Sequence, residues 1–183
     1  MDGPSWAVRE FGAAVLGDAR RTARLVDLAT TLGARPTASL PEGCGTGARL
    51  KAAYRFFEND AIAPEAMLAS HVAATWERIG QVPVVLAVQD TTLLDYTHHP
   101  ATTGLGPLDG RHQGFLVHST VAFTLERLPL GLLAQQVWTR DPAQPGRRAT
   151  RKLRPTAEKE SQKWLTSLAV VAACAPSVRP RAW

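Results

Sequence analysis

The sequence has little cysteine and no long apolar run. Its two cysteines, Cys44 and Cys174, lie far apart and belong to no paired Cys or Cys/His spacing, so neither a disulfide framework nor a zinc site is indicated. No apolar segment approaches the length of about 20 residues needed to cross a bilayer. The N-terminal MDGPSWAVREFG also lacks the basic and then apolar pattern of a signal peptide. We therefore expect a cytoplasmic globular protein with reduced thiols.

The chain has no strong excess of charge, but its charge is unevenly distributed. Residues 1–80 carry nine basic and nine acidic side chains, and residues 81–140 carry three and four, whereas residues 141–183 carry nine and three. The net charge of +5 therefore comes from the last segment. A basic run of this kind attracts phosphate, although more often it is a solvated loop. Most of the excess lies in Arg147, Arg148, Arg151, Lys152 and Arg154.

A first long helix is predicted directly after Asp18. The Asp18 side chain can accept hydrogen bonds from free amides of the first turn, and Gly33 and Pro36 end the helix. Apolar residues at helical spacing predict one buried face: Leu25, Leu28, Ala29 and Leu32. The arginines lie mainly off this stripe and are expected to be free to reach a partner: Arg20, Arg21 and Arg24. A basic helix face is usually only solvated, so it does not indicate a function by itself.

Two more helices follow in residues 1–80. After a glycine-containing loop at 41–47, the segment 49–59 predicts a helix on which Lys51 and Arg55, four residues apart, share a cationic face. Its core stripe is predicted to be Leu50, Ala53, Tyr54 and Phe57. Tyr54 and Phe56 are interpreted as core, because aromatics at helical spacing are more often core than base-stacking platforms. Pro64 suits the first turn of a third helix, with an apolar stripe of Leu68, Val72, Trp76 and Ile79. Residues 5–80 are therefore predicted to form a compact helical module.

A short apolar run at 84–88 predicts a strand buried on both faces. Gln89, Asp90, Thr91 and Thr92 follow at once, which places Asp90 at the carboxyl edge of a central strand, where open α/β sheets usually bind ligands. A carboxylate at this position is a candidate metal ligand. The alternative interpretation is a strand that passes into a turn, with the Asp90 side chain bonded to local backbone amides.

The remainder of the chain predicts a hairpin and a helix. A loop at 97–114 carries His98, His99 and His112 without a recognised metal-ligand spacing, and we assign them no role. Apolar alternation at 115–123 and 130–138 predicts two antiparallel strands, and residues 157–174 predict a helix. Its charged residues near the start, Glu158, Glu160 and Lys163, are interpreted as solvent-facing.

Four motifs in order resemble one protein family: LGDARRTARL, AAYRFFEN, VLAVQDTTLLDY and EKESQKWL. They are similar to segments of the bacterial cut-and-paste DDE transposases of the IS-four group, the Tn-five-like transposases, over about residues 6–170. The resemblance implies an α+β fold. A helical transposon-end DNA-binding domain at 5–80 would precede the first part of a ribonuclease-H-like α/β domain at 81–175, made of a central strand, an antiparallel hairpin and a helix. Residues 176–183 would form an aberrant tail.

The resemblance also implies roles for single residues. Asp90 would be the first of three metal-binding catalytic carboxylates that hold Mg²⁺, and Arg55 would contact transposon-end DNA. The expected partner is the double-stranded DNA of the inverted repeats in the nucleoid, with a homodimer or a heterodimer with an intact transposase as further partners and no membrane. The DNA-binding set is expected to be Arg20, Arg21, Arg24, Arg35, Lys51 and Arg55, with residues 147–154 as weaker phosphate contacts.

The chain departs from the family at its C-terminal end. The family's next strand should carry a second Asp in a DREAD-like segment and a later helix should carry a Glu, but the chain reads PSVRPRAW after Ala175. Two-metal chemistry places ions about 3.5–4 Å apart, which one carboxylate cannot do. We therefore expect a truncated transposase that binds DNA ends, binds Mg²⁺ weakly and does not cut DNA alone. The alternative is a non-enzymatic regulator that blocks transposition.

Overall fold

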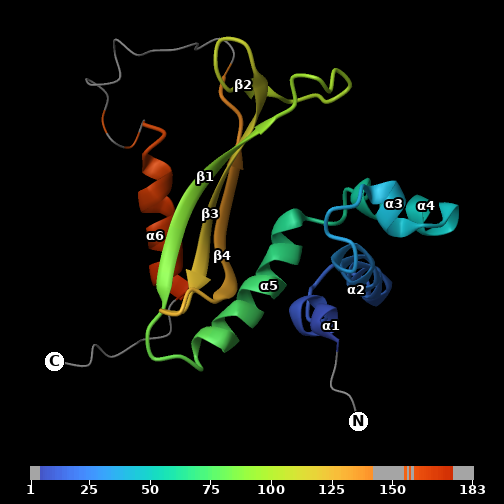
Figure 1. Ribbon diagram of the computed structural model, residues 1–183, viewed down its shortest axis with the longest axis horizontal. Coiled ribbons are helices and arrows are strands. Elements are labelled where there is room, and N and C mark those ends of the chain that lie inside the picture. Colours follow the sequence, from blue (N-terminus) through green and yellow to red (C-terminus); the bar gives the residue numbers. More distant parts are fainter. Residues whose placement is uncertain (1–4, 142–154, 156, 158, 175–183) are drawn as a thin grey trace. The chain divides into compact units, whose positions relative to one another are not determined.

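The computed structural model describes residues 5–141, 155, 157 and 159–174 of the chain (Figure 1). Its contacts divide the chain into two compact parts, Met1–Glu77 and Arg78–Trp183, called unit 1 and unit 2 below. The predicted basic run at 147–154 and the tail at 176–183 lie outside the described residues. Along the described part, no helix is both long and apolar enough to pass through a membrane.

Unit 1 is helical, and the predicted start of its long helix is confirmed. Asp18 is the N-cap of α2, with its Oδ1 accepting a hydrogen bond of 2.8 Å from the Arg20 amide. Thr46 caps α4 in the same way, through the Arg49 amide. These caps satisfy amides that have no partner within their helices. The helices are α1 (Trp6–Phe11), α2 (Ala19–Gly33), α3 (Leu40–Cys44), α4 (Gly47–Phe57) and α5 (Pro64–Ile79), the last of which crosses the division between the units.

Two short helices were not predicted from the sequence, although both carry a start signal. The Ser5 hydroxyl accepts from the Val8 amide at the start of α1. At α3, Ser39 and Glu42 form a reciprocal capping box, in which Glu42 Oε2 lies 2.9 Å from the Ser39 amide. The predicted loop at 41–47 is therefore wrong in its first half, because this box stabilises a helical turn there.

The core of unit 1 corrects the predicted orientation of α4. Phe56 is 4% exposed and packs with Leu25 and Leu28 of α2, whereas Tyr54 is 45% exposed and Phe57 is 55% exposed. The predicted stripe is therefore wrong for Tyr54 and Phe57, whereas the interpretation of Phe56 as a core residue is confirmed. Both sets of positions have helical spacing, and the packing of α4 on α2 decides between them, so α4 is rotated relative to the prediction.

Helix α5 buries small and polar residues more deeply than its predicted apolar stripe. Ser70, Ala74 and Thr75 are buried, whereas the predicted stripe of Leu68, Val72, Trp76 and Ile79 is only partly buried. The Ser70 hydroxyl donates a hydrogen bond of 2.8 Å to the Glu10 carbonyl oxygen. The Ser70 contact with Glu10 connects α5 to α1 through a small polar side chain.

Unit 2 contains an antiparallel sheet, so the predicted hairpin and the α+β class are confirmed. Strand β3 is central: it pairs with β1 along one edge and with β2 and β4 along the other. Helix α6 lies against β3 and β4 (Figure 1). The elements are β1 (Leu86–Asp95), β2 (Gly106–Pro107), β3 (Gln113–Phe123), β4 (Pro129–Trp138) and α6 (Gln162–Cys174).

The first strand differs from its prediction in three ways. It does not end before Asp90 but continues to Asp95, it forms an edge of the sheet among the described residues, and it is not buried on both faces. The β-branched Thr91 and Thr92 favour extended backbone. Polar residues can continue an exposed edge strand, so they do not have to mark a turn. Apolar side chains on and before this strand are about half exposed: Val84, Leu86 and Val88.

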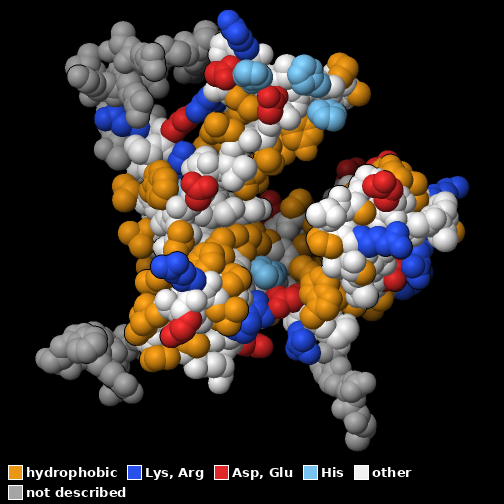
Figure 2. Space-filling model, in the orientation of Figure 1, with side chains coloured by type: hydrophobic (Ala, Val, Ile, Leu, Met, Phe, Trp, Pro, Cys, Tyr) orange, Lys and Arg blue, Asp and Glu red, His pale blue; other side chains and the backbone are white. Residues whose placement is uncertain are grey.

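Apolar surface is also exposed on α6. Leu165, Leu168 and Val170 are half exposed, and the space-filling view shows orange side chains gathered over this helix (Figure 2).

The buried histidine under α6 predicts an acid-sensitive fold. His118 is fully buried, its Nε2 donates to Gln89 Oε1 at 3.0 Å, and its Nδ1 lies 2.8 Å from Thr91 Oγ1, while its ring meets Trp164 edge to face. Burial lowers the pKa of His118 below its ordinary value of 6.5, and the Lys163 ammonium lowers the pKa further. Below pH 6.5 the unfolded chain therefore binds a proton that the folded chain does not.

We expect the free energy of unfolding of unit 2 to fall as the pH drops below 6.5, by at most about 1.4 kcal/mol per pH unit from this group. Urea titrations at pH 7.5 and pH 5.5 measure the loss, and His118→Gln should reduce it. An equal pH dependence in the variant would contradict this role.

Candidate nucleic-acid interface

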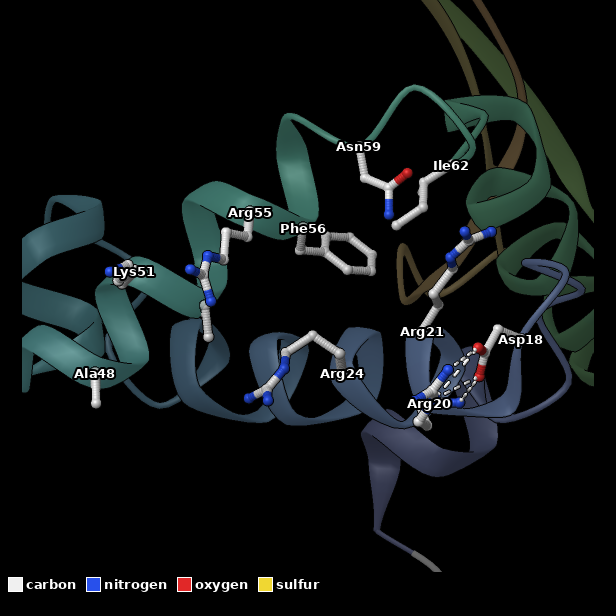
Figure 3. Close-up of a pocket in the computed structure, with 11 residues that line it drawn as sticks. Asp18, Arg20, Arg21, Arg24, Ala48, Lys51, Arg55, Phe56, Asn59 and Ile62 are labelled. Atoms are coloured by element: carbon white, nitrogen blue, oxygen red, sulfur yellow. Dashed lines mark hydrogen bonds and ion pairs between the residues drawn. The ribbon is translucent and has the colours of Figure 1, made fainter.

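Unit 1 carries a hollow of about 600 Å³ between α2 and α4 (Figure 3). Five basic side chains and one carboxylate line it, and we call it the basic groove. It contains five of the six residues predicted to bind DNA, whereas Arg35 does not line it. The full lining is Asp18, Arg20, Arg21, Arg24, Ala48, Lys51, Ala52, Arg55, Phe56, Asn59 and Ile62.

Helical spacing brings these cations together. Arg20 and Arg24 lie four residues apart on α2, and Lys51 and Arg55 lie four apart on α4, so each pair occupies one face of its helix. Phe56 reaches the floor of the groove while it also belongs to the core. The packing that buries Phe56 therefore also positions the cations.

Arg20 is engaged by the helix cap. Its Nη2 lies 2.8 Å from Asp18 Oδ2, and its Nε lies 3.2 Å from both carboxylate oxygens. The hydrogen bonds from Arg20 lower the pKa of Asp18 to about 2, and the same contact raises the pKa of Arg20. The expectation that Arg20 is free to reach a partner is therefore wrong for its Nε and Nη2 edge, while its Nη1 group points to no partner among the described residues.

Arg21 is also engaged, but with backbone. Its Nη1 donates to the Leu16 carbonyl oxygen at 2.9 Å and lies 3.5 Å from the Ala61 carbonyl oxygen. These contacts connect the start of α2 to the turn that closes the groove after α4. Arg21 thus holds the groove together, and the prediction that it is free is wrong.

The remaining cations differ in how they are paired. Arg24 Nη1 lies 3.0 Å from Asp27 Oδ2 on the next turn of α2. Lys51 and Arg55 are exposed, and no hydrogen bond or ion pair is found for either among the residues that the structure describes. Arg35, away from the groove, donates to the Glu42 carbonyl oxygen at 3.4 Å. Lys51 and Arg55 are therefore the side chains most ready to contact phosphate.

Asp90 belongs to no comparable cluster of charged side chains within the described part of unit 2. It occupies the middle of β1, exposed and opposite Ser119, whose hydroxyl accepts a hydrogen bond of 3.2 Å from Gln135 Nε2. Both sequence interpretations, the strand end and the turn, are wrong about its position. Among the described residues no group of three His, Cys, Asp or Glu side chains could hold a metal ion. Magnesium requires a near-octahedral set of oxygen ligands, so these residues alone do not fit it.

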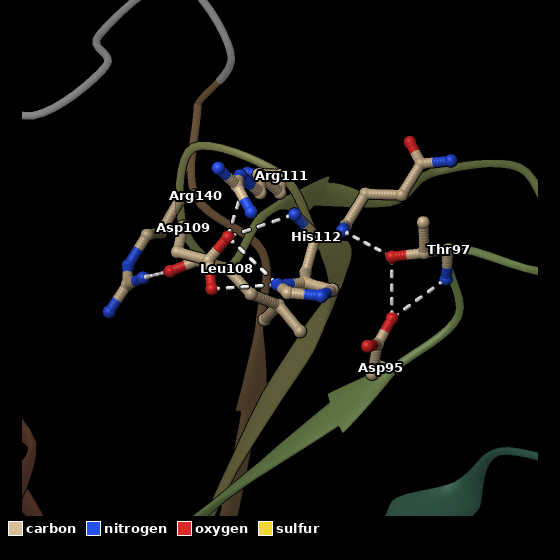
Figure 4. A network of polar contacts seen from close by, with 8 residues as sticks. Asp95, Thr97, Leu108, Asp109, Arg111, His112 and Arg140 are labelled. Carbon is tan, nitrogen blue, oxygen red and sulfur yellow. Dashed lines mark hydrogen bonds and ion pairs between the residues drawn. The ribbon is translucent and has the colours of Figure 1, made fainter.

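Of the loop histidines, His112 belongs to a network of polar contacts (Figure 4), and the described part of the chain contains no metal-binding cluster. His112 Nδ1 lies 2.8 Å from Asp109 Oδ2. The pKa of Asp109 falls to about 2 because it accepts from the Arg111 amide and then from His112, and the Asp109 contact raises the pKa of His112. Asp95 accepts from the Thr97 hydroxyl at 2.6 Å, so these groups stabilise the loop.

The charges near α6 contact neighbouring residues, although Glu160 is solvent-exposed as predicted and Lys163 is partly buried. Glu160 Oε1 lies 2.5 Å from Arg140 Nε, and Arg140 also donates to the Leu108 carbonyl oxygen. Lys163 Nζ lies 5.0 Å from the Trp138 ring centroid. These contacts connect the region before α6 to the sheet, while Glu158 lies outside the described residues.

The comparison with known protein families concerns unit 1. The basic groove is lined by residues between Asp18 and Ile62, all of which fall within the matched segment. Residues 4–62 match the model of a family described as transposase DNA-binding, so this part of the chain is similar to the DNA-binding region at the N-terminus of a transposase.

Proposed function

We propose that unit 1 binds duplex DNA at the ends of a transposon, as the N-terminal domain of a Tn-five-like transposase of the IS-four group. The observation that carries the proposal is the coincidence of the basic groove with the segment similar to transposase DNA-binding domains. Neither finding alone has the same weight, because a basic surface is common and a family match does not say which face binds.

The electrostatics of the groove support binding to the DNA backbone. Lys51 and Arg55 have exposed cationic groups without a partner among the described residues, so a phosphate can contact them without breaking an ion pair. Arg20 and Arg24 form ion pairs with Asp18 and Asp27, so they contribute less to phosphate binding than Lys51 and Arg55 do. Each phosphate that the protein neutralises releases condensed counterions, which makes binding weaken as salt rises.

Catalysis is a separate proposal that depends on Asp90. As one carboxylate of a DDE set, Asp90 would need further oxygen ligands, which the described residues do not supply. We assign no magnesium-dependent step to these residues. The function that unit 1 supports is therefore DNA binding, which a transposase and a regulator of transposition would share.

The test is a salt titration of the purified full chain on two duplexes, one with the inverted-repeat ends that flank its gene and one with the same bases scrambled. We expect tighter binding to the ends and a linear fall of log K with log salt concentration. Magnesium is then added to look for nicks. Absence of binding to either duplex would refute the proposal, and nicking abolished by Asp90→Ala would show that this chain completes a catalytic site.

A further inference from the structure

We propose that Arg24, oriented by Asp27, reads a guanine in the major groove and so sets the sequence preference of the basic groove. This inference rests on the proposed DNA binding and goes beyond it, because it separates one base-reading residue from residues that contact phosphate. An arginine reads guanine by donating two hydrogen bonds from adjacent N–H groups to O6 and N7. The question is which basic side chain of the groove has such a pair available.

The hydrogen bonds of the groove leave the Nε and Nη2 edge of Arg24 free while Asp27 orients its guanidinium. On Arg20, the Nε and Nη2 edge is bound to Asp18, and only the Nη1 and Nη2 end of the guanidinium remains. On Arg24, Asp27 binds only Nη1, at 3.0 Å, and no acceptor for Nε or Nη2 is found among the described residues. Arg21 donates to backbone carbonyls, and Lys51 has no planar pair of donors.

Arg55 is the remaining arginine, and it differs from Arg24 in orientation. No side chain among the described residues holds Arg55 in place, so it would lose rotamer entropy on binding a base edge. The contact with Asp27 holds Arg24 in one direction before DNA arrives. Preorganisation of this kind reduces the entropic cost of a specific contact.

The charge of Asp27 also makes Arg24 favour a base over a phosphate. A phosphate that approaches Arg24 would come close to the Asp27 carboxylate and be repelled, whereas guanine offers neutral acceptors. Both side chains of the pair are 44% exposed, so they remain accessible from solvent. Helix α2, which carries both, is of a width that the major groove admits, since that groove is about 12 Å wide.

The first experiment replaces the guanines of the end duplex one at a time by 7-deazaguanine, which lacks the N7 acceptor but still pairs with cytosine. We expect one position at which this change weakens binding of the wild-type chain by roughly 5- to 150-fold. Arg24→Gln should bind the end duplex more weakly and be insensitive at that same position. Arg24→Lys keeps the charge and can still donate to guanine, but it lacks the planar fork, so its sensitivity at that position should lie between those of the wild type and Arg24→Gln.

A second variant tests the positioning role of Asp27. Asp27→Asn removes the carboxylate and should reduce the preference for the end duplex over the scrambled one. Glu77→Gln is the matched control, because it makes the same change of charge in unit 1 away from the basic groove, and it should keep the preference. Thermal unfolding of each variant separates loss of preference from loss of fold.

Other results would overturn the inference. If no guanine position is sensitive in the wild type and insensitive in Arg24→Gln, Arg24 does not read guanine. If Asp27→Asn binds both duplexes more tightly in equal proportion, Asp27 only competes with phosphate. In both cases the wild-type chain still binds DNA and the proposed function stands, whereas a wild-type chain that binds no duplex would refute both proposals.

Discussion

Replacing Phe56 by alanine is expected to destabilise unit 1 by about 3–5 kcal/mol. The Phe56 side chain is 4% exposed and belongs to the core cluster with Leu25 and Leu28, so the change leaves a cavity that the surrounding helices fill only in part. Small domains have a total stability of about 5–15 kcal/mol, and the loss is a large fraction of it. Urea unfolding followed by circular dichroism measures the change.

Phe57→Ala is the matched control for this prediction. It removes the same side chain from the next position of α4, where the ring is 55% exposed, and we expect a loss of at most about 1 kcal/mol. Similar losses for the two variants, or a larger loss for Phe57→Ala, would contradict the observed orientation of α4. Because Phe56 also lines the basic groove, its replacement should weaken DNA binding at temperatures where unit 1 begins to unfold.

The sequence predicts the long helices of unit 1 well because their signals are local. Asp18 caps α2 and Pro64 begins α5, and these effects need only neighbouring residues. The orientation of α4 is different, since positions 53 and 56 and positions 50, 53, 54 and 57 both fit a helical stripe. Packing against α2 determines which of the two stripes is buried. This packing depends on residues distant in sequence, so local sequence patterns do not predict it.

The position of Asp90 shows the same limit in unit 2. A short apolar run followed by polar residues fits a buried strand that ends, and it also fits an edge strand that continues. The pairing of Asp90 with Ser119 of β3 shows that the strand continues as an edge strand. This contact joins residues distant in sequence. The strand itself was predictable, but its place in the sheet was not.

The residues of the basic groove were predictable from the sequence, but the hydrogen bonds and ion pairs of their side chains were only partly so. The Arg24 contact with Asp27 has a local signal, an opposite charge three residues along a helix. The Arg21 contacts with the carbonyl oxygens of Leu16 and Ala61 have none, because they depend on how the turn after α4 meets α2. The sequence alone therefore does not distinguish which of Arg20, Arg21 and Arg24 is free to contact a partner.

Neutralising Lys51 and Arg55 together is expected to give the largest loss of DNA affinity. Both lie in the basic groove, exposed and without a partner among the described residues. A hydrogen bond to a charged group contributes about 1.5–3 kcal/mol, so the variant Lys51→Gln, Arg55→Gln should lose at least about a hundredfold in affinity at low salt. The slope of log K against log salt should become less negative by about 0.9 for each lost phosphate contact.

Arg49→Gln provides the control that distinguishes direct contact from general attraction. Arg49 lies on the same helix as Lys51 and Arg55 but does not line the groove. Its replacement removes one positive charge, as do the single groove variants Lys51→Gln and Arg55→Gln. We expect its salt slope to stay close to that of the wild type, because counterion release follows the phosphates actually neutralised. If Arg49→Gln changes the slope as much as either groove variant alone, the DNA follows the overall charge of unit 1, and the basic groove is not its binding site.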